Sequence, residues 1–148
     1  MYQDGLPSNY SIIATFKVTK DTAWKSWDLW QVSDPEGQEQ VGLRFHGDTH
    51  SLDFFYIDPH ASQTLRRFSG VEKLFDDDWH KLALSVKGSQ VKLLIDCEEV
   101  GVESIDELRP VTNAGYTSIV KRAAGDRSMS VSSHLRLFYS AKTIFHLL

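Results

Sequence analysis

The amino-acid sequence predicts an all-β protein built as an antiparallel β-sandwich. Short segments of alternating apolar and polar residues are separated by turn-forming residues at intervals of about 8–12 residues, which is typical of sandwiches and barrels. The sequence contains no strong signal for a long helix. The clearest alternation lies in the stretch 74–100. Here Leu82, Leu84 and Val86 form one face of a strand, and the polar turn 87–90 leads into a second strand. This hairpin is the centre of the predicted fold.

Five further strands are predicted ahead of the hairpin, at 11–18, 27–32, 40–46, 51–57 and 63–68. The first begins with apolar residues on both faces, which predicts a central position in its sheet. A short helical turn is expected at 71–75, and the large ring of Trp79 is expected to cover one end of the core. After the hairpin, the sequence predicts an acidic connection over 101–110 and strands over 117–121 and 129–139.

Bulk composition favours one ordinary globular domain. The chain has 148 residues, 41% apolar and 24% charged, so residues 1–148 are expected to form a single domain. The formal net charge of −4 argues against a general nucleic-acid binder, which needs a basic face. No apolar run approaches the ~20 residues that a membrane-spanning helix requires. The first residues show neither the basic start nor the apolar segment of a secretory signal.

Several sequence motifs occur in the order found in a known family. They are LFDDDWHKLALSV, VKLLIDCEEV, GLPSNYSIIATFKV, WDLWQVSD and EQVGLRFHGDTHSLDFFY. Together they closely resemble the thrombospondin N-terminal-like domain of the fibril-associated collagens, a relative of the laminin G domain. The resemblance covers about residues 4–124 and leaves 130–148 as a divergent tail. It implies a concanavalin-like jelly roll that is incomplete at both ends. It also implies a non-enzymatic adhesion role in the extracellular matrix, within a secreted collagen-type parent protein.

The single cysteine, Cys97, cannot form an intramolecular disulfide. In the resembled family, the cysteine at this position pairs with a second one near the end of the domain, and the C-terminal stretch here has none. The resemblance therefore implies a disulfide partner left unpaired, in a module that is truncated or alternatively ended. The neighbouring Asp96, Glu98 and Glu99 disfavour a thiolate, so Cys97 is not expected to act as a nucleophile.

The turn 46–50 is the candidate metal site. His46, Asp48 and His50 bring two imidazoles and a carboxylate together, and these groups suit a structural zinc ion, with His60 as a more distant candidate. An ordinary polar turn is the commoner explanation. Some laminin G relatives bind calcium through carboxylates at the rim of the sandwich. Asp34, Asp48 and Asp58 lie in predicted loops of this chain, but the sequence does not place them on one rim.

The resemblance also implies binding partners. These are extracellular matrix proteins or collagen fibrils and, through basic residues, heparin or heparan sulfate-like polysaccharides. Clustered Lys and Arg residues neutralise a sulfated chain, and such binding weakens with salt. The basic candidates are Arg66, Arg67, Lys73, Lys81, Lys121, Arg122 and Arg127. They form no continuous block, and a solvated face of mixed charge is the alternative. A further candidate is Asn9, in the N-glycosylation sequon Asn9-Tyr10-Ser11.

Catalysis is not expected from the acidic residues. Asp76 to Asp78 with His80 lie in a corner, and Glu98 and Glu99 lie at a strand end, whereas glycosidase carboxylates face each other across a groove. The sequence has no nucleophile elbow, phosphate loop or metalloprotease motif. It therefore predicts a non-enzymatic matrix module. The alternative is a carbohydrate-binding or carbohydrate-processing protein on the same architecture.

Overall fold

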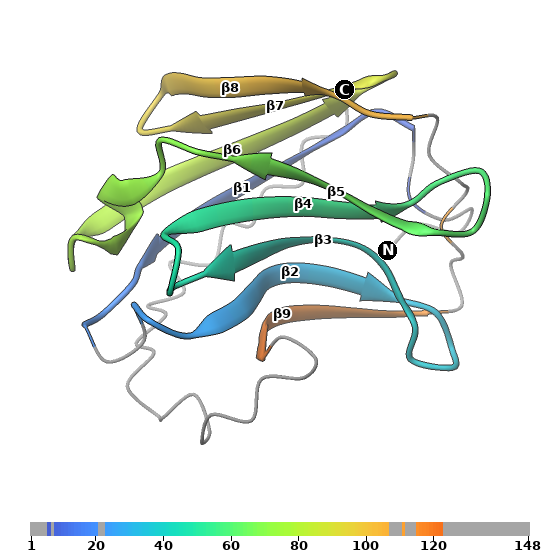
Figure 1. Cartoon of the computed structure of the whole chain (residues 1–148), viewed down its shortest axis with the longest axis horizontal. Coiled ribbons are helices and arrows are strands. Elements are labelled where there is room, and N and C mark those ends of the chain that lie inside the picture. The colour runs from blue at the N-terminus through green and yellow to red at the C-terminus, as the bar shows by residue number, and fades with distance from the viewer. Residues whose placement is uncertain (1–5, 7, 21–22, 107–110, 112–114, 123–148) are drawn as a thin grey trace.

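In the computed structural model, the chain folds into two antiparallel β-sheets that form two layers (Figure 1). The structure describes residues 6, 8–20, 23–106, 111 and 115–122. Its described residues contain one short 3-10 helix, η1 (Glu72–Phe75), and no helix that is long and apolar enough to cross a membrane. The all-β sandwich predicted from the sequence is confirmed.

Each sheet mixes strands from distant parts of the chain. The first sheet has the order β1-β6-β7-β8, with β1 (Tyr10–Lys17), β6 (Trp79–Lys87), β7 (Gln90–Ile95) and β8 (Glu98–Ser104). The second sheet has the order β5-β4-β3-β2-β9, with β2 (Ser26–Ser33), β3 (Glu39–His46), β4 (Ser51–Ile57), β5 (Gln63–Phe68) and β9 (Tyr116–Arg122). All neighbouring strands pair antiparallel.

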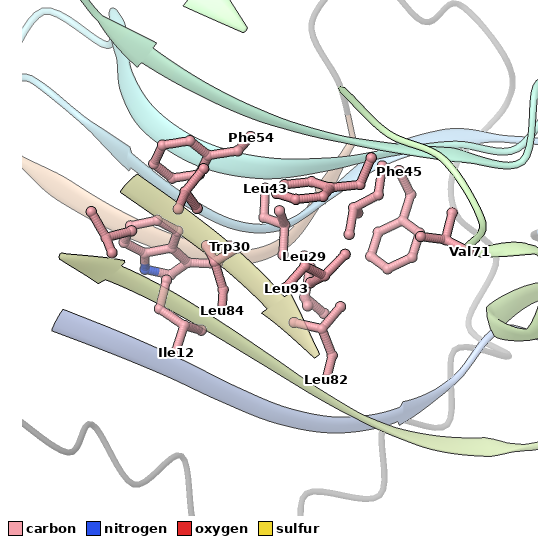
Figure 2. Close-up of a cluster of buried hydrophobic side chains, with 14 of the residues drawn as sticks. Ile12, Leu29, Trp30, Leu43, Phe45, Phe54, Val71, Leu82, Leu84 and Leu93 are labelled. Atoms are coloured by element: carbon pink, nitrogen blue, oxygen red, sulfur yellow. The ribbon is translucent and has the colours of Figure 1, made fainter. Parts of the chain in front are cut away.

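The core lies between the two sheets, because alternate residues of each strand point to the same side. Trp27 and Phe45 stack with ring centroids 4.5 Å apart, and Phe16 packs edge-on against Phe45 at 5.4 Å. Figure 2 shows side chains from both sheets meeting in this layer, among them Ile12, Leu82, Leu84, Leu93, Leu43, Phe45 and Phe54. Burial of these apolar side chains is the main force that holds the sheets together.

The predicted strands ahead of the hairpin, the hairpin itself and the strand at 117–121 are all confirmed, with shifts of one or two residues at their ends. The expected acidic connection over 101–110 is wrong for residues 101–104, which belong to β8, while 107–110 lie outside the described residues. β8 returns beside β7 through a two-residue turn, Asp96 and Cys97, with φ of 51° and 68°. Positive φ at both positions is the geometry of a type I′ hairpin, which Gly and Asn favour. Asp also suits the first position, but Cys97 stands where Gly is usual at the second, so the sequence signal was weak.

Two other expectations fail. The first strand was predicted to be central, but β1 lies at the edge of its sheet among the described strands. Trp79 was expected to cover the core, yet it is 42% exposed, because it lies on the outward-facing side of β6 together with Lys81. The predicted strand at 129–139 and the divergent tail lie outside the described residues.

Candidate functional site

The outer face of the five-stranded sheet carries a line of charges that alternates in sign. We call Arg67, Asp53, Arg44 and Asp28 the charged row. These residues lie opposite one another in register across β5, β4, β3 and β2. The row is unusual because its acids are buried, with Asp28 0% and Asp53 2% exposed. Buried carboxylates require compensating charge, and the neighbouring strands supply it.

Each acid of the charged row is held by an arginine through two bonds. Arg44 donates from Nε to Asp28 Oδ1 at 2.6 Å and from Nη2 to Asp28 Oδ2 at 2.9 Å. Arg67 donates in the same way to Asp53, at 2.8 and 2.9 Å. Such paired bonds fix orientation and are stronger than bonds between neutral groups. They tie β3 to β2 and β5 to β4 on the side away from the core.

Further groups complete this network. Arg44 also donates to Glu39 Oε1 at 2.8 Å, and its guanidinium lies 4.7 Å from the ring centre of Phe55. His46 Nε2 lies 2.8 Å from Asp53 Oδ2. Burial alone would raise the pKa of Asp53, but Arg67 and His46 outweigh it and lower this pKa to about 2. Asp53 therefore stays ionised near neutral pH and cannot serve as a proton donor.

A second charged cluster lies at the end of the sandwich where η1 leads into β6 and where β7 turns into β8 (Figure 1). His80 is only 8% exposed and lies between two carboxylates. Its Nε2 is 2.8 Å from Asp76 Oδ1, and its Nδ1 is 2.8 Å from Asp96 Oδ2. We call this arrangement the His80 clamp. It joins the corner after η1 to the β7–β8 turn.

The clamp requires both ring nitrogens to donate, which only the protonated imidazole can do. Desolvation would lower the pKa of His80, but the bonds that His80 donates to Asp76 and Asp96 outweigh it and raise this pKa above its usual 6.5. The bond to His80 is also the largest cause that lowers the pKa of Asp96, to about 2. Asp96 is held further by Lys73, whose Nζ lies 3.4 Å from Asp96 Oδ2. Each group thus keeps the other charged.

The residues proposed as metal ligands do not converge. His46 is paired with Asp53 as above, while Asp48 accepts the backbone N–H of Thr49 at 3.0 Å. The ring of His50 stacks on Phe75 at 4.6 Å, and His60 lies in the turn between β4 and β5. In the described part of the chain, no three His, Cys, Asp or Glu residues are placed to hold a metal ion.

The loop carboxylates proposed for calcium serve their own turns. Asp34 accepts the backbone N–H of Gln38 at 2.7 Å. Asp58 accepts the backbone N–H groups of His60 and Ser62, at 2.8 and 3.0 Å. Such bonds from a turn's backbone N–H groups to its own Asp side chain are typical of ordinary polar turns.

The predicted basic residues are scattered, and most are paired. Arg67 is held by Asp53, Lys73 lies near Asp96 and Glu98, and Arg66 donates from Nε to the carbonyl of Ser104 at 2.8 Å. Lys121 and Arg122 belong to β9, and Arg127 lies outside the described residues. Lys81 differs from these. It is exposed on the outer face of the four-stranded sheet and makes no ion pair with the described residues.

Two lysines that were not among the basic candidates share this face with Lys81. Lys87 lies on the same side of β6 and is exposed, and Lys92 of β7 lies opposite Ser85 between them. We call Lys81, Lys92 and Lys87 the lysine row. The alternation of both strands would have placed them together, since Val91 and Leu93 point to the core and Lys92 points away.

The thiol of Cys97 is free and exposed in the β7–β8 turn.

Comparison with known proteins gives the sandwich a class. Mouse laminin alpha1 chain, domains LG4-5, aligns with a TM-score of 0.58 at 18% identity, over 90% of this chain and 34% of that one. The botulinum neurotoxin serotype D ligand binding domain in complex with N-acetylneuraminic acid aligns with a TM-score of 0.60 at 14% identity, over 82% of this chain and 31% of that one. At these identities the matches show the fold alone. The chain is a laminin G-like β-sandwich of the jelly-roll kind.

The relatives in sequence are collagens. Human collagen alpha-1(XIX) chain is 28% identical over 147 residues, which is 97% of this chain and 13% of the relative. Collagen alpha-1(XXI) chain of Xenopus laevis is 28% identical over 93% of this chain and 14% of its own length. Human collagen alpha-1(XVI) chain is 29% identical over 78% of this chain and 7% of its own length. No family model matches the sequence.

These matches confirm the resemblance to the thrombospondin N-terminal-like, laminin G-like domain of the fibril-associated collagens. The chain spans only a small part, 7–14%, of the length of the three collagen relatives. The similarity supports an extracellular matrix module of the collagen type. It is also consistent with a protein that is not an enzyme.

The His80 clamp predicts a pH dependence of folding stability. A raised His80 pKa stabilises the fold fully below about pH 6.5, and this contribution is lost as pH rises through the folded-state value. The lowered pKa of Asp96 adds stability above about pH 3.8, which is lost as pH falls toward about 2. In urea unfolding, the difference in unfolding free energy between wild type and His80→Gln should therefore be larger at about pH 5.5 than at about pH 9.

The matched control is His60→Gln, which removes an exposed histidine from a turn outside the clamp. Its effect on unfolding free energy should be small and should change little over the same interval. A gap between wild type and His80→Gln that stays constant, or grows, with rising pH would show that the protonated imidazole does not hold the clamp.

The charged row predicts a steep cost for losing Arg44. Arg44→Met would leave the buried Asp28 carboxylate without its two guanidinium bonds, and we expect a loss of about 3–5 kcal/mol of unfolding free energy. Arg66→Met is the comparison, because its ion-pair partner Asp106 is 56% exposed and lies 3.8 Å away. That change should cost about 1 kcal/mol. Equal losses in the two variants, measured by urea unfolding, would contradict the importance of burial in the row.

Proposed function

We propose that the chain forms one non-enzymatic module of an extracellular, collagen-type matrix protein, and that it binds anionic polysaccharides of the heparan sulfate kind. The similarity to collagen chains supports the matrix setting. The lysine row is the observation that carries the ligand class. It supplies cations on an open sheet face, where a long sulfated chain can lie without entering a pocket.

The spacing of the lysine row fits an extended ligand. Lys81 and Lys87 lie six positions apart on β6, which at about 3.3 Å per residue is roughly 20 Å. Lys92 falls between them on the neighbouring strand. Its contact with Glu99, at 3.7 Å, joins side chains that are 42% and 55% exposed. Such an exposed pair contributes little and is easily exchanged for a sulfate group.

The remaining surface favours this face over the other basic candidates. Arg66, Arg67 and Lys73 contact acids or carbonyls of the protein itself, so a ligand would have to compete for them. Lys81 and Lys87 have no such competitor among the residues that the structure describes. Between them on the same side of β6 lie only the small side chains of Ala83 and Ser85, which obstruct the two lysines little.

The charged row argues against the alternative of a carbohydrate-processing enzyme. Asp28 and Asp53 are acids on one sheet face, as in a concanavalin-like glycosidase, but each is bonded twice by an arginine. A glycosidase needs one carboxyl group that is protonated near neutral pH. Asp53 does not meet this requirement, because its lowered pKa keeps it ionised near neutral pH.

Retention on immobilised heparin tests the proposal. The wild-type chain should bind at low ionic strength and elute as sodium chloride is raised, because salt screens the contacts. The double variant Lys81→Gln/Lys87→Gln should bind about three- to tenfold more weakly. It should not alter unfolding, since both side chains are exposed.

The matched control is Lys20→Gln/Lys25→Gln, which removes the same charge from the connection between β1 and β2. It should elute close to wild type. Equal weakening in both double variants would mean that net charge, not the lysine row, governs retention. Absence of retention by the wild type at low salt would contradict the proposed ligand class, and hydrolysis of a glycan would contradict the non-enzymatic role.

A further inference from the structure

Asn9 immediately precedes β1 and lies next to the turn that joins β6 to β7. It is the first residue of Asn9-Tyr10-Ser11, the only sequon in the chain, since the other asparagine, Asn113, is followed by Ala and Gly. Asn9 is exposed, whereas Tyr10 is 6% exposed and packs into the core. The acceptor side chain therefore lies at the surface, while the residue after it anchors the strand.

The orientation of the Asn9 amide is fixed by its neighbour. The backbone N–H of Gly88 donates to Asn9 Oδ1 at 3.0 Å. A backbone N–H can only donate, so the oxygen must face the turn and the nitrogen must point the other way. The Nδ2 atom makes no hydrogen bond with the residues that the structure describes. The amide thus uses its oxygen to brace the β6–β7 turn and leaves its nitrogen open to solvent.

We propose that Asn9 carries an N-linked glycan. In the transfer, Nδ2 forms a bond to the anomeric carbon of a lipid-linked oligosaccharide and loses one proton. The bond from that carbon to the lipid diphosphate breaks, and the lipid diphosphate leaves. The product is still a planar amide with a free carbonyl oxygen, so the bond from Gly88 is retained after modification.

The glycan would occupy one particular end of the molecule. β6 runs from Trp79, beside the His80 clamp, to Lys87, beside the β6–β7 turn. A sugar on Asn9 therefore lies at the turn end, beside Lys87 of the lysine row, and leaves the opposite end, with Lys81, the clamp and Cys97, uncovered. The inference rests on the proposed function in one respect, which is that the chain enters the secretory pathway.

The test exports the full 148-residue chain from a mammalian cell line behind a signal peptide from another protein. This design supplies entry to the pathway, so it separates the acceptor question from the proposed matrix role and from heparin binding. The variants are Ser11→Ala, Ser11→Thr and Asn9→Asp. Ser11→Ala destroys the sequon but keeps the bond from Gly88, and Asn9→Asp keeps an oxygen for that bond but removes the nitrogen.

Wild type and Ser11→Thr should run as heavier species that peptide N-glycosidase F converts to the unmodified size. The same enzyme should convert Asn9 to Asp in the tryptic peptide. Ser11→Ala and Asn9→Asp should lack the heavier species. Transfer occurs on the growing chain, so the cell-associated fraction gives the same answer if a variant is poorly secreted. Wild type of unmodified size, with an unmodified Asn9 peptide in both fractions, would overturn the proposal.

Discussion

The packing of two apolar sheet faces against each other constrains every other feature of this molecule. Trp27, Phe45 and Phe16 fill the space between the layers, and the strands that carry them must present alternate residues to the core. Each strand is therefore left with a second face that is free to carry polar groups. The properties of the module follow from what the sequence places on these two outer faces.

The two outer faces have different chemistry. On the five-stranded sheet, charges of opposite sign lie opposite one another and satisfy one another, so that Asp28 and Asp53 are buried and each is bonded to an arginine. On the four-stranded sheet, Lys81 and Lys87 have no partner of this kind within the described part of the chain. A closed network stabilises the fold and offers a ligand little, whereas unpaired cations remain available for binding.

Alternation was enough to predict the strands, because a period of two is visible in residues that are close in sequence. It was not enough for the β7–β8 turn, where Cys97 adopts positive φ at a position that is usually Gly. The order of the strands within each sheet could not be predicted from the sequence either. The edge position of β1 depends on its pairing with β6, about 70 residues further along the chain.

The candidate site was predictable only in part for the same reason. His80 and Asp76 are neighbours in sequence, but Asp96 meets them only because β7 pairs with β6. Arg44 and Asp28 are 16 positions apart and meet through the register of β2 and β3. The metal hypothesis for His46 and His50 relied on their closeness in one turn. Residues at the two sides of a hairpin end can point to different neighbours, which here are Asp53 and Phe75.

In the proposed function, the module binds through the outer face of the four-stranded sheet, and the charged row takes no part. The most direct measurement is a titration of the isotope-labelled chain with a heparin oligosaccharide, followed by amide chemical shifts. The largest shifts should fall on Lys81, Lys87 and Lys92 and on the residues between them. Shifts centred instead on Arg44, Asp53 and Arg67 would contradict it.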